Sequence, residues 1–454
     1  MKTYNDLFEL GKKEAERQKF VLDAIREHER SNEYKNAVIA KDYAEGRNAT
    51  IMQYQKILYT LTGQAVPDNY SANHKCASGF FRRFVTQEAS YLLGNGVQFA
   101  EESTKEKLGD NFDNVLYKLG KSALIQAVAF GFYNKDHIEV FDYTEFVPLW
   151  NEETGGLEAG IRYWQLDKNK PLRATLYEID GYTDYIKRKD EDISELHEKR
   201  KYNEIVAISE ADGEEIIDGE NYSGFPIVPL WANSEKQSEL VGRREQIDCY
   251  DLIKSGFAND LDDASMIYWT LQNAGGMDDI DLTKFVERMK TVKAAVVGDE
   301  DGARAEAHTI DVPYRARERA LNRLEKDLYK DFMALDVEII SAGNITATQI
   351  EAAYEPLNQK TDEFEMCVID FINGILALAG IEDKPTFTRS QISNRSEKLQ
   401  NLLQSAEYID SDTITEQVLI LLDMGDKYED VITKLTEQET GRLEPVINSE
   451  SEEI

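Results

Sequence analysis

The stretch from Asp311 to Gly380 most constrains the fold, because two helical patterns in it are separated by a short interruption. Pro313 suits the first turn of a helix, where a backbone N–H is not needed. Apolar residues then recur at helical spacings of three and four, at Leu321, Leu324, Leu328, Phe332 and Leu335. The sequence therefore predicts a helix over 313–335 with one apolar face.

The interruption consists of small or flexible residues, Ser341, Ala342, Gly343 and Asn344. Either Thr346 with Gln349 or Thr348 with Glu351 can then form a capping box that starts a new helix. That helix contains the apolar run MCVIDFINGILALAG over 366–380, which predicts deep burial. A small polar loop between two helices is expected to protrude and to move.

Charge restricts the possible partners of the chain. Its 454 residues include 52 Lys and Arg against 86 Asp and Glu, a formal net charge of −34. Such a surface repels phosphates, which argues against nucleic-acid binding by the surface as a whole. With 23 tyrosines and 18 phenylalanines the chain has enough apolar surface for cores, and its length suits two or three domains.

The cysteines and the hydropathy point to a soluble intracellular protein. Cys76, Cys249 and Cys367 lie far apart in the sequence and fit reduced thiols better than a disulfide framework. No apolar run approaches the roughly 20 residues of a membrane span, so no membrane partner is expected.

The first half of the chain changes from helical to strand patterns. Residues 1–65 predict charged amphipathic helices, and a further helix over 75–93 is expected to end at the cap Gly94-Asn95-Gly96. Residues 116–132 are apolar and predict another helix. Short aromatic and β-branched segments between 137 and 209 predict an antiparallel sheet, followed by an acidic hairpin or loop at 211–221. Residues 1–245 should therefore form an α+β region.

A second striped helix follows an extended segment that contains Pro226 and Pro229. Its apolar positions again keep helical spacings, at Tyr250, Ile253, Phe257, Leu261 and Ala264. Between the two striped helices lies an insert with a strand-like start at 266–276, a short helix at 281–290 and a strand at 291–298. After 385, small amphipathic helices are expected, followed by a disordered acidic tail.

Catalytic signatures are missing from the sequence. The five histidines, His28, His74, His137, His197 and His308, show no metal-ligand spacing and are predicted to be ordinary surface residues. The acidic pairs Asp262-Asp263 and Asp278-Asp279, with the acidic run at 298–302, leave open a divalent-metal hydrolase. Adjacent carboxylates are expected by chance in so acidic a chain, so solvated charge is the favoured interpretation.

One basic island interrupts the acidic sequence, formed by Arg315, Arg317, Arg319 and Arg323. Two interpretations stay open. The arginines either form a helix face bridged to Glu318, Glu325 and their neighbours, or contact an acidic surface of another subunit.

Four stretches in this order resemble the portal proteins of tailed bacteriophages, in the family typical of long non-contractile-tailed phages of Gram-positive hosts. They are KDYAEGRN at 41–48, FRRFVTQEASYLLGNGVQF at 81–99, the run from 225 to 263, and the run from 309 to 332 followed by SAGNITATQI. The resemblance covers most of the chain and rests on the order and spacing of these stretches.

The resemblance implies a mixed α+β, mainly helical portal fold assembled as a cyclic ring, normally of twelve subunits. It implies a wing at 1–245, a stem helix at 246–265, a clip at 266–312, a second stem helix at 313–335, a tunnel loop at 336–349, a long wing and channel helix at 350–385, and a crown with an acidic tail at 386–454. Such a ring forms the channel at one capsid vertex through which double-stranded DNA is packaged and ejected. It is not an enzyme and needs no cofactor.

The resemblance also implies partners and sites. Tyr268, Trp269 and Leu271 of the clip are expected to dock the terminase motor and later the head–tail adaptors. The tunnel-loop residues 341–344 are expected to line the channel, and Arg315, Arg319 and Arg323 to lie on the stem. Scaffold and major capsid proteins are further expected partners, at the portal vertex of the virion and in the host cytoplasm during assembly.

The acidic charge fits such a channel, because a wall that repels DNA keeps the duplex near the axis. Two alternatives remain at this stage, an acidic metal-dependent hydrolase and a monomeric acidic scaffold protein. The particle mass in solution separates them from a ring.

Overall fold

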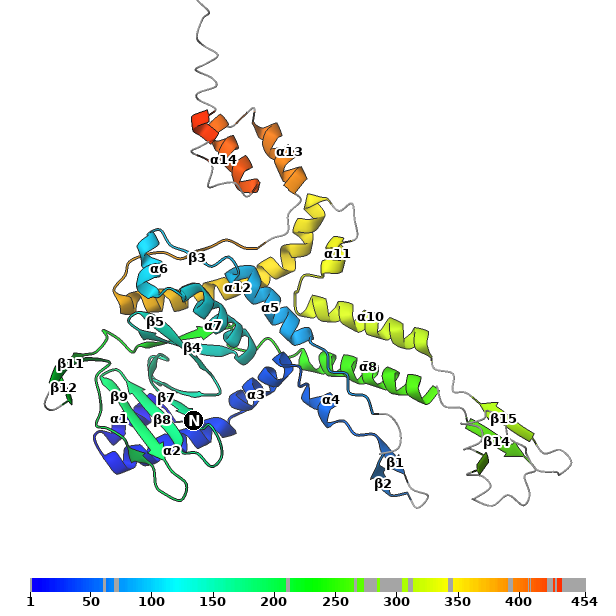
Figure 1. Cartoon of the computed structure of the whole chain (residues 1–454), viewed down its shortest axis with the longest axis horizontal. Helices are drawn as coiled ribbons and strands as arrows, with labels where there is room; N and C mark the ends of the chain where they lie inside the picture. Colours follow the sequence, from blue (N-terminus) through cyan, green and yellow to red (C-terminus); the bar gives the residue numbers. More distant parts are fainter. Residues whose placement is uncertain are drawn as a thin grey trace, which may run out of the picture. The chain divides into compact units, whose positions relative to one another are not determined.

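Helices and antiparallel sheets alternate along the chain as the sequence patterns predict, and the structure, a computed structural model, is mixed α+β (Figure 1). It describes residues 2–59, 63–68, 73–209, 213–264, 268–272, 284–285, 304–308, 313–341, 346–390, 395–406, 408, 410–422, 428 and 431–434. These residues belong to two units. The first contains Met1–Ala334 and Lys360–Arg389, and the second contains Leu335–Gln359 and Ser390–Ile454.

The first unit begins with four helices, α1 (Tyr4–Leu10), α2 (Glu14–Arg30), α3 (Asn32–Ala44) and α4 (Ala49–Gln53). The prediction of helices over 1–65 is wrong for its last part. There β1 (Ile57–Tyr59) pairs antiparallel with β2 (Ala65–Pro67). The β-branched and aromatic side chains of β1 favour this extended conformation over a helix.

Helix α5 (Phe80–Leu93) confirms the predicted end of the second helical stretch. The N–H of Gly94 donates to the carbonyl of Ser90 at 3.0 Å, and Gly96 has the positive φ of 74° that favours glycine. The helix begins at Phe80 rather than at Lys75, because residues 74–78 bind along another helix in extended form.

Helices α6 (Glu102–Leu108) and α7 (Phe112–Gln126) lead into a sheet. The predicted helix over 116–132 is wrong beyond Gln126, because residues 128–134 form strand β4. This strand lies between β13 (Ile227–Trp231) and β5 (His137–Asp142). All of its residues except the last are buried, so it lacks the alternation that marks a half-exposed strand.

A five-stranded antiparallel sheet follows, with the strand order β10-β9-β8-β7-β6. Four of its strands confirm predicted segments, Phe146–Trp150 (β6), Leu157–Trp164 (β7), Leu172–Glu178 (β8) and Gly181–Lys187 (β9), whereas Ser194–Glu195 (β10) was not predicted. The prediction of a single sheet is wrong, because β5 and the predicted segment at 203–209 belong to other sheets. Helix α2 packs on this sheet through a cluster that includes Val21, Ile25 and Leu176, all buried.

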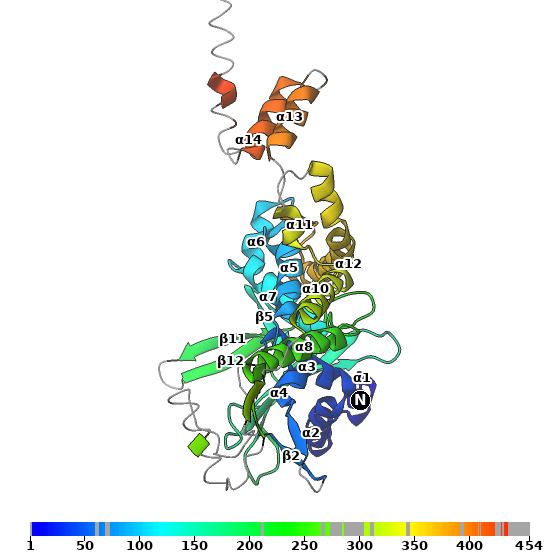
Figure 2. The ribbon, with the colours of Figure 1, turned by 90° about the vertical axis from the view of Figure 1, so that its right-hand side faces the viewer.

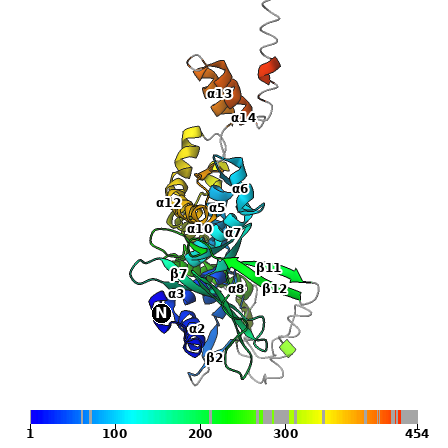
Figure 3. The same ribbon diagram turned by 90° about the vertical axis from the view of Figure 1, so that its left-hand side faces the viewer.

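The segment predicted as an acidic hairpin or loop contains β12 (Gly213–Glu220). With β11 (Asn203–Ser209) it forms a hairpin that pairs with no further strand of the described residues. It projects from the first unit (Figure 2, Figure 3). A short pairing of β3 (Val97–Gln98) with β16 (Thr386–Phe387) joins two parts of the unit that lie far apart in the sequence.

The striped helices are α8 (Arg244–Ala264) and α10 (Tyr314–Asp331), close to their predicted bounds. In the predicted insert, β14 (Tyr268–Gln272) pairs antiparallel with β15 (Arg304–His308), a strand that the sequence patterns did not predict. The predicted strand at 291–298 and most of the predicted helix at 281–290 lie outside the described residues.

The second unit contains α11 (Val337–Ser341), α13 (Arg395–Ser405) and α14 (Ser411–Leu421). Helix α12 (Ala347–Ala379) begins in this unit and ends in the first, where Phe364, Phe371 and Ile375 enter the main hydrophobic cluster. Among the described helices, none combines the length and the apolar character that a membrane crossing needs.

Candidate functional site: the paired helices α8 and α10

Helices α8 and α10 lie side by side and run antiparallel (Figure 1). An ion pair joins Arg317, near the start of α10, to Asp260, near the end of α8. At the opposite end, Gln246 hydrogen-bonds the Asp331 carboxylate, and the Arg243 Nε donates to the Asp331 carbonyl at 2.7 Å. Polar contacts at both ends therefore fix how far one helix is displaced along the other.

The base of this pair is buried and its far end is not. Leu328 and Phe332 are completely buried, and the Phe332 ring lies 4.6 Å from that of Phe84 on α5. At the far end, Leu261 is 52% exposed and Tyr314 51% exposed. The apolar stripes predicted from the sequence are thus covered within the chain at one end only.

A row of polar side chains on α8 binds the extended segment 74–78, which we call the strap. Asp251, Ser255 and Asn259 are spaced by four residues and are all nearly fully buried. Their side-chain oxygens accept hydrogen bonds from the backbone N–H groups of Ser78, Cys76 and His74, at 2.9, 2.9 and 2.6 Å respectively.

These three hydrogen bonds, which we call the ladder, form because the helical repeat of α8 and the extended repeat of the strap match in length. Four residues of an α-helix rise by about 6 Å. Two residues of an extended chain rise by about 6.6 Å. Every second N–H of the strap therefore meets every fourth residue of α8.

Asp251 is the ladder residue that can carry a charge, so its burial costs the most free energy unless hydrogen bonds compensate for it. Burial raises the pKa of Asp251, and hydrogen bonds from Asn48 and Ser78 offset part of that rise. The Asn48 amide also donates to the Ser78 carbonyl at 3.1 Å. The apolar stripe of α8 does not indicate this contact. The polar spacing of Asp251, Ser255 and Asn259 was the signal that could have revealed the strap.

A second buried polar cluster joins α12 to α5 and to the segment that precedes α8. The Lys360 ammonium lies 2.5 Å from the Glu88 carboxylate and 2.7 Å from that of Glu239. Burial raises the pKa of Glu88, and Lys360 counteracts only part of this effect. Arg243 pairs with Glu239 at 3.2 Å and supplies a second positive charge.

The expected tunnel loop lies in the second unit. The capping box uses the first of the two predicted pairs. The Thr346 N–H donates to the Gln349 Oε1 at 3.2 Å, and the Gln349 N–H donates to the Thr346 Oγ1 at 3.4 Å. Part of the range 336–349 is helical rather than a loop, since Ser341 is the last residue of α11. Ala342, Gly343 and Asn344 lie outside the described residues.

The expected docking residues of the insert lie on one short strand. Tyr268 pairs with His308, Trp269 with Ala307 and Leu271 with Ala305 in the β14–β15 register. The acidic run at 298–302 and the pair Asp278-Asp279 lie outside the described residues.

Among the described residues, the arginines at the start of α10 pair with neither Glu318 nor Glu325, but one of them pairs with a neighbouring carboxylate of the same helix. Arg317 pairs with Asp260, Arg323 donates to Asp327 at 2.8 Å, and Arg315 donates to the Tyr314 hydroxyl at 3.0 Å. Arg319 forms no ion pair with the described residues. The Arg323–Asp327 pair agrees with the first interpretation of this island, and the contact with another subunit stays a prediction.

The prediction of surface histidines is wrong for His28, which is completely buried. Its Nε2 lies 2.9 Å from the Tyr143 carbonyl, and its ring packs edge-on against Tyr34, Tyr143 and Tyr163. Burial lowers the pKa of His28 to about 4. His74, in contrast, pairs with Asp262 at the surface. In the described ranges, no group of three or more acidic, histidine or cysteine side chains is placed to hold a metal.

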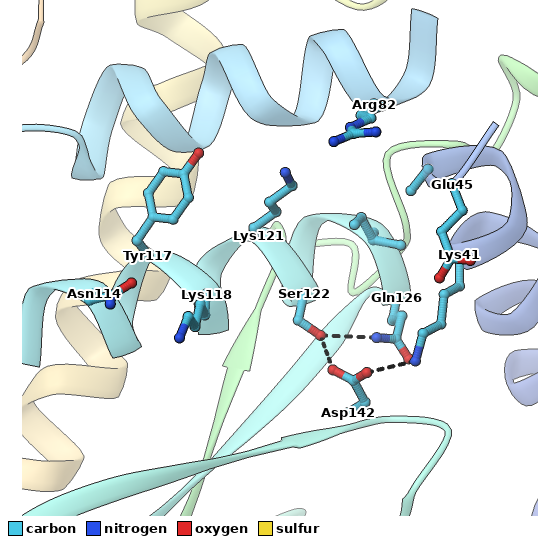
Figure 4. Close-up of a pocket in the computed structure, with 12 residues that line it drawn as sticks. Lys41, Glu45, Arg82, Asn114, Tyr117, Lys118, Lys121, Ser122, Gln126 and Asp142 are labelled. Atoms are coloured by element: carbon cyan, nitrogen blue, oxygen red, sulfur yellow. Dashed lines mark hydrogen bonds and ion pairs between the residues drawn. The ribbon is translucent and has the colours of Figure 1, made fainter. Parts of the chain in front are cut away.

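A cleft of about 600 Å³ beside α7 gathers positive charge (Figure 4). The Lys41 Nζ and the Ser122 Oγ hold Asp142 on its wall, at 2.9 and 2.6 Å. Arg82, Lys118 and Lys121 also line the cleft and form no ion pair with the described residues. The arrangement suits an anionic group and includes no nucleophile with an adjacent base.

A family model and two individual proteins of similar sequence indicate the same family for this chain. The family model described as phage portal protein, SPP1 Gp6-like, matches residues 23–438. The portal protein of Clostridium phage phiCD119 is 26% identical over 356 residues, which cover 71% of this chain and 76% of that protein. The portal protein of Bacillus phage SPP1 is 24% identical over 385 residues, which cover 78% of this chain and 74% of that protein.

Two solved structures are also similar. A chain in the neck of a native gene transfer agent particle aligns with a TM-score of 0.44 and 8% identity, over 75% of this chain and 90% of that one. A chain in the virion of the same kind of particle aligns with a TM-score of 0.43 and 9% identity, over 75% and 89%. Because the family model covers most of its sequence, the chain belongs to the SPP1 Gp6-like family of phage portal proteins.

Proposed function

We propose that the chain assembles into a ring at one capsid vertex and forms the channel through which double-stranded DNA is packaged and ejected. The observation that carries this proposal is the family match over residues 23–438, which includes α8, α10 and the segment between α10 and α12. The exposed apolar residues at the far end of the α8–α10 pair support assembly, because one chain does not cover them.

The net charge of −34 suits a channel that must not hold its cargo. Each lysine or arginine bound to a phosphate adds affinity for the duplex, and several together would retain it. A ring of acidic chains repels the duplex from its wall and allows it to slide. The chain acts as a conduit in this proposal, without a reaction of its own.

Three surfaces receive roles in this ring. Residues 341–344 line the narrowest part of the channel, Tyr268, Trp269 and Leu271 dock the terminase motor and then the head–tail adaptors, and Arg315, Arg319 and Arg323 face neighbouring subunits along the stem. Scaffold and major capsid proteins contact the ring during assembly in the host cytoplasm. The Thr346–Gln349 capping box starts α12 at a defined residue, which supports a fixed end for the loop on its C-terminal side.

The particle mass tests the ring directly. Sedimentation of the purified chain at micromolar concentration should give a closed assembly of about a dozen 51.8 kDa chains with cyclic symmetry in micrographs. A monomer or dimer under these conditions would count against the proposal. Magnesium-dependent DNA cleavage that disappears in the Asp262→Asn/Asp263→Asn variant would instead support a hydrolase.

The loop is tested by Gly343→Pro, which restricts the backbone without adding charge. Rings should form normally, and the amount of nuclease-protected DNA per particle should fall. Gly343→Ala is the matched control, because it restricts the backbone far less. Normal packaging by Gly343→Pro rings would remove the loop from the transport mechanism.

The docking role of the insert is tested by Trp269→Ala. Rings should persist, while binding of the packaging motor or of the adaptors weakens. Trp164→Ala is the control, since Trp164 lies on β7 in the first unit and is partly exposed. Rings that fall apart in the Trp269→Ala variant would assign Trp269 to the subunit interface.

A further inference from the structure

The β1–β2 hairpin and the residues that lead into it form an apolar arm, which the structure describes at residues 54–59 and 63–67. Ile57 is 56% exposed and Tyr59 75% exposed, and Tyr54 and Val66 are exposed as well. In the described part of the chain the hairpin pairs with no third strand, and an isolated two-stranded hairpin is marginally stable in water. Such a hairpin needs a surface to cover its apolar side chains.

Residues 50–52, which precede the arm, are held in place by hydrogen bonds. The Thr50 hydroxyl of α4 donates to the Asp248 carboxylate of α8 at 2.7 Å. The Lys75 Nζ donates to the Met52 carbonyl at 2.5 Å. The arm therefore leaves the first unit at a defined point beside α8, and both project from the same side of that unit (Figure 1).

The charge of the arm differs from that of the rest of the chain. Residues 49–67 contain no Asp or Glu and a single Lys, in a chain with 86 acidic residues. Two copies of so acidic a chain repel each other wherever acidic surfaces meet. A segment without carboxylates is where a second copy can approach without this cost.

The start of α10 is the matching surface. Residues 314–323 contain four arginines and one glutamate. Tyr314 is exposed there, and Arg319 has no ion-pair partner among the described residues. Tyrosine rings such as those of Tyr54 and Tyr59 bind guanidinium groups by cation–π contact.

We propose that the β1–β2 arm of one copy packs against the start of α10 on the next copy, with Ile57 and Tyr59 beside Tyr314 and Arg319. The contact joins two different surfaces of the same chain, which is the kind of contact that closes a ring. This inference rests on the ring proposed above and names a contact that holds it together.

The test adds positive charge to the arm. The Ile57→Lys/Tyr59→Lys variant lowers the net negative charge, so non-specific repulsion between copies decreases. If the arm faces the α10 arginines, the new lysines are repelled there, and the fraction of chains in rings should fall at least tenfold in sedimentation. Leu166→Lys/Ile179→Lys makes the same charge change at two exposed residues outside the arm and should leave the rings intact.

Exchange of the charge on α10 makes the test specific. Adding Arg319→Glu to the Ile57→Lys/Tyr59→Lys variant should restore a substantial part of the ring fraction, since opposite charges then meet. Rings of Ile57→Lys/Tyr59→Lys at the level of the unaltered chain would overturn the arm contact but not the ring. Absence of rings from the unaltered chain would overturn the ring itself.

Crosslinking keeps the inference testable if the lysine variant fails to fold. In a Cys249→Ser background, which removes the exposed native thiol, copies with Tyr59→Cys are mixed with copies with Arg319→Cys. A short bis-maleimide should then give dimers of twice the 51.8 kDa chain. Leu166→Cys in place of Tyr59→Cys should give none, and equal yields from both mixtures would contradict the contact.

Discussion

The arm and the strap are neighbours in sequence, but the arm exposes apolar side chains to solvent whereas the strap binds to α8 through its polar backbone groups. The arm at residues 54–67 exposes Ile57 and Tyr59, whereas the strap at 74–78 has its backbone N–H groups satisfied by buried oxygens of α8. A buried donor is satisfied within the chain, because leaving it unpaired costs free energy. An exposed apolar side chain needs no hydrogen-bond partner within its own chain. It can therefore stay exposed in the single chain and become covered when a second copy binds.

This difference separates what holds the chain together from what joins chains. Loss of a strap contact should destabilise the chain itself. Loss of an arm contact should leave the chain stable and affect only assembly. Substitutions in the two segments should therefore differ in their effect on the free energy of unfolding.

Asp251→Ala should have the largest effect. The change removes the acceptor of the Ser78 N–H and of the Asn48 amide and leaves both donors buried. Each unpaired buried donor costs about 1–3 kcal/mol, so the free energy of unfolding should fall by roughly 3 kcal/mol or more. Urea unfolding followed by circular dichroism measures this fall.

Asp262→Ala is the control, because the Asp262–His74 pair is at the surface and worth less than about 1 kcal/mol. Equal losses of unfolding free energy in the two variants would contradict the inference that the strap contacts stabilise the chain.

Lower pH should destabilise the chain through His28, a buried polar group outside the strap. Its pKa is about 4 in the folded chain against the ordinary 6.5, so the unfolded chain binds the proton first as the pH falls. The contribution is complete above pH 6.5 and is lost as the pH falls towards 4. One pKa unit corresponds to about 1.4 kcal/mol, so roughly 2 kcal/mol should be lost between pH 7 and pH 5.

The measurement compares the unfolding free energy of the unaltered chain and of His28→Gln across this pH range. Carboxylates titrate in both chains, so the difference between them isolates His28. An identical pH dependence in both chains would show that the histidine does not sense this range.

Ser255→Ala should have a smaller effect than Asp251→Ala. It removes one neutral acceptor and leaves the Cys76 N–H unpaired, which costs roughly 1–2 kcal/mol. Because Asp251 and Ser255 bind one continuous segment, the double variant should lose less than the sum of the two single losses. Strict additivity would show that the rungs of the ladder act independently.

Residues with a strong local pattern were predicted correctly from the sequence. The stripes of α8 and α10 follow helical spacing, and the Thr346–Gln349 capping box needs only residues three apart. The strands between 146 and 187 alternate or carry β-branched and aromatic side chains next to turn residues, and their pairing follows the chain order.

Features that depend on distant partners were missed. Strand β4 is buried on both faces by its neighbours, so its apolar run at 128–132 matches a helix equally well. His28 is enclosed by tyrosines that include Tyr143 and Tyr163 of the sheet region, and nothing near it in sequence indicates this. The strap contacts join residues that lie about 180 positions apart in the sequence, and the spacing of four residues between the polar side chains of α8 was the one local signal for them.

The arm should show the smallest effect on unfolding, and this prediction separates it most clearly from the strap. In unassembled chains at low concentration, Ile57→Lys/Tyr59→Lys should change the free energy of unfolding by no more than about 0.5 kcal/mol, as expected for exposed positions. The same variant should lose its rings at higher concentration. Urea unfolding and sedimentation on one preparation give both values. A loss near that of Asp251→Ala in unassembled chains would mean that the arm is already packed within its own chain. The distinction between the two segments would then fail, because Ile57 and Tyr59 would belong to the core of one subunit rather than to the contact between two.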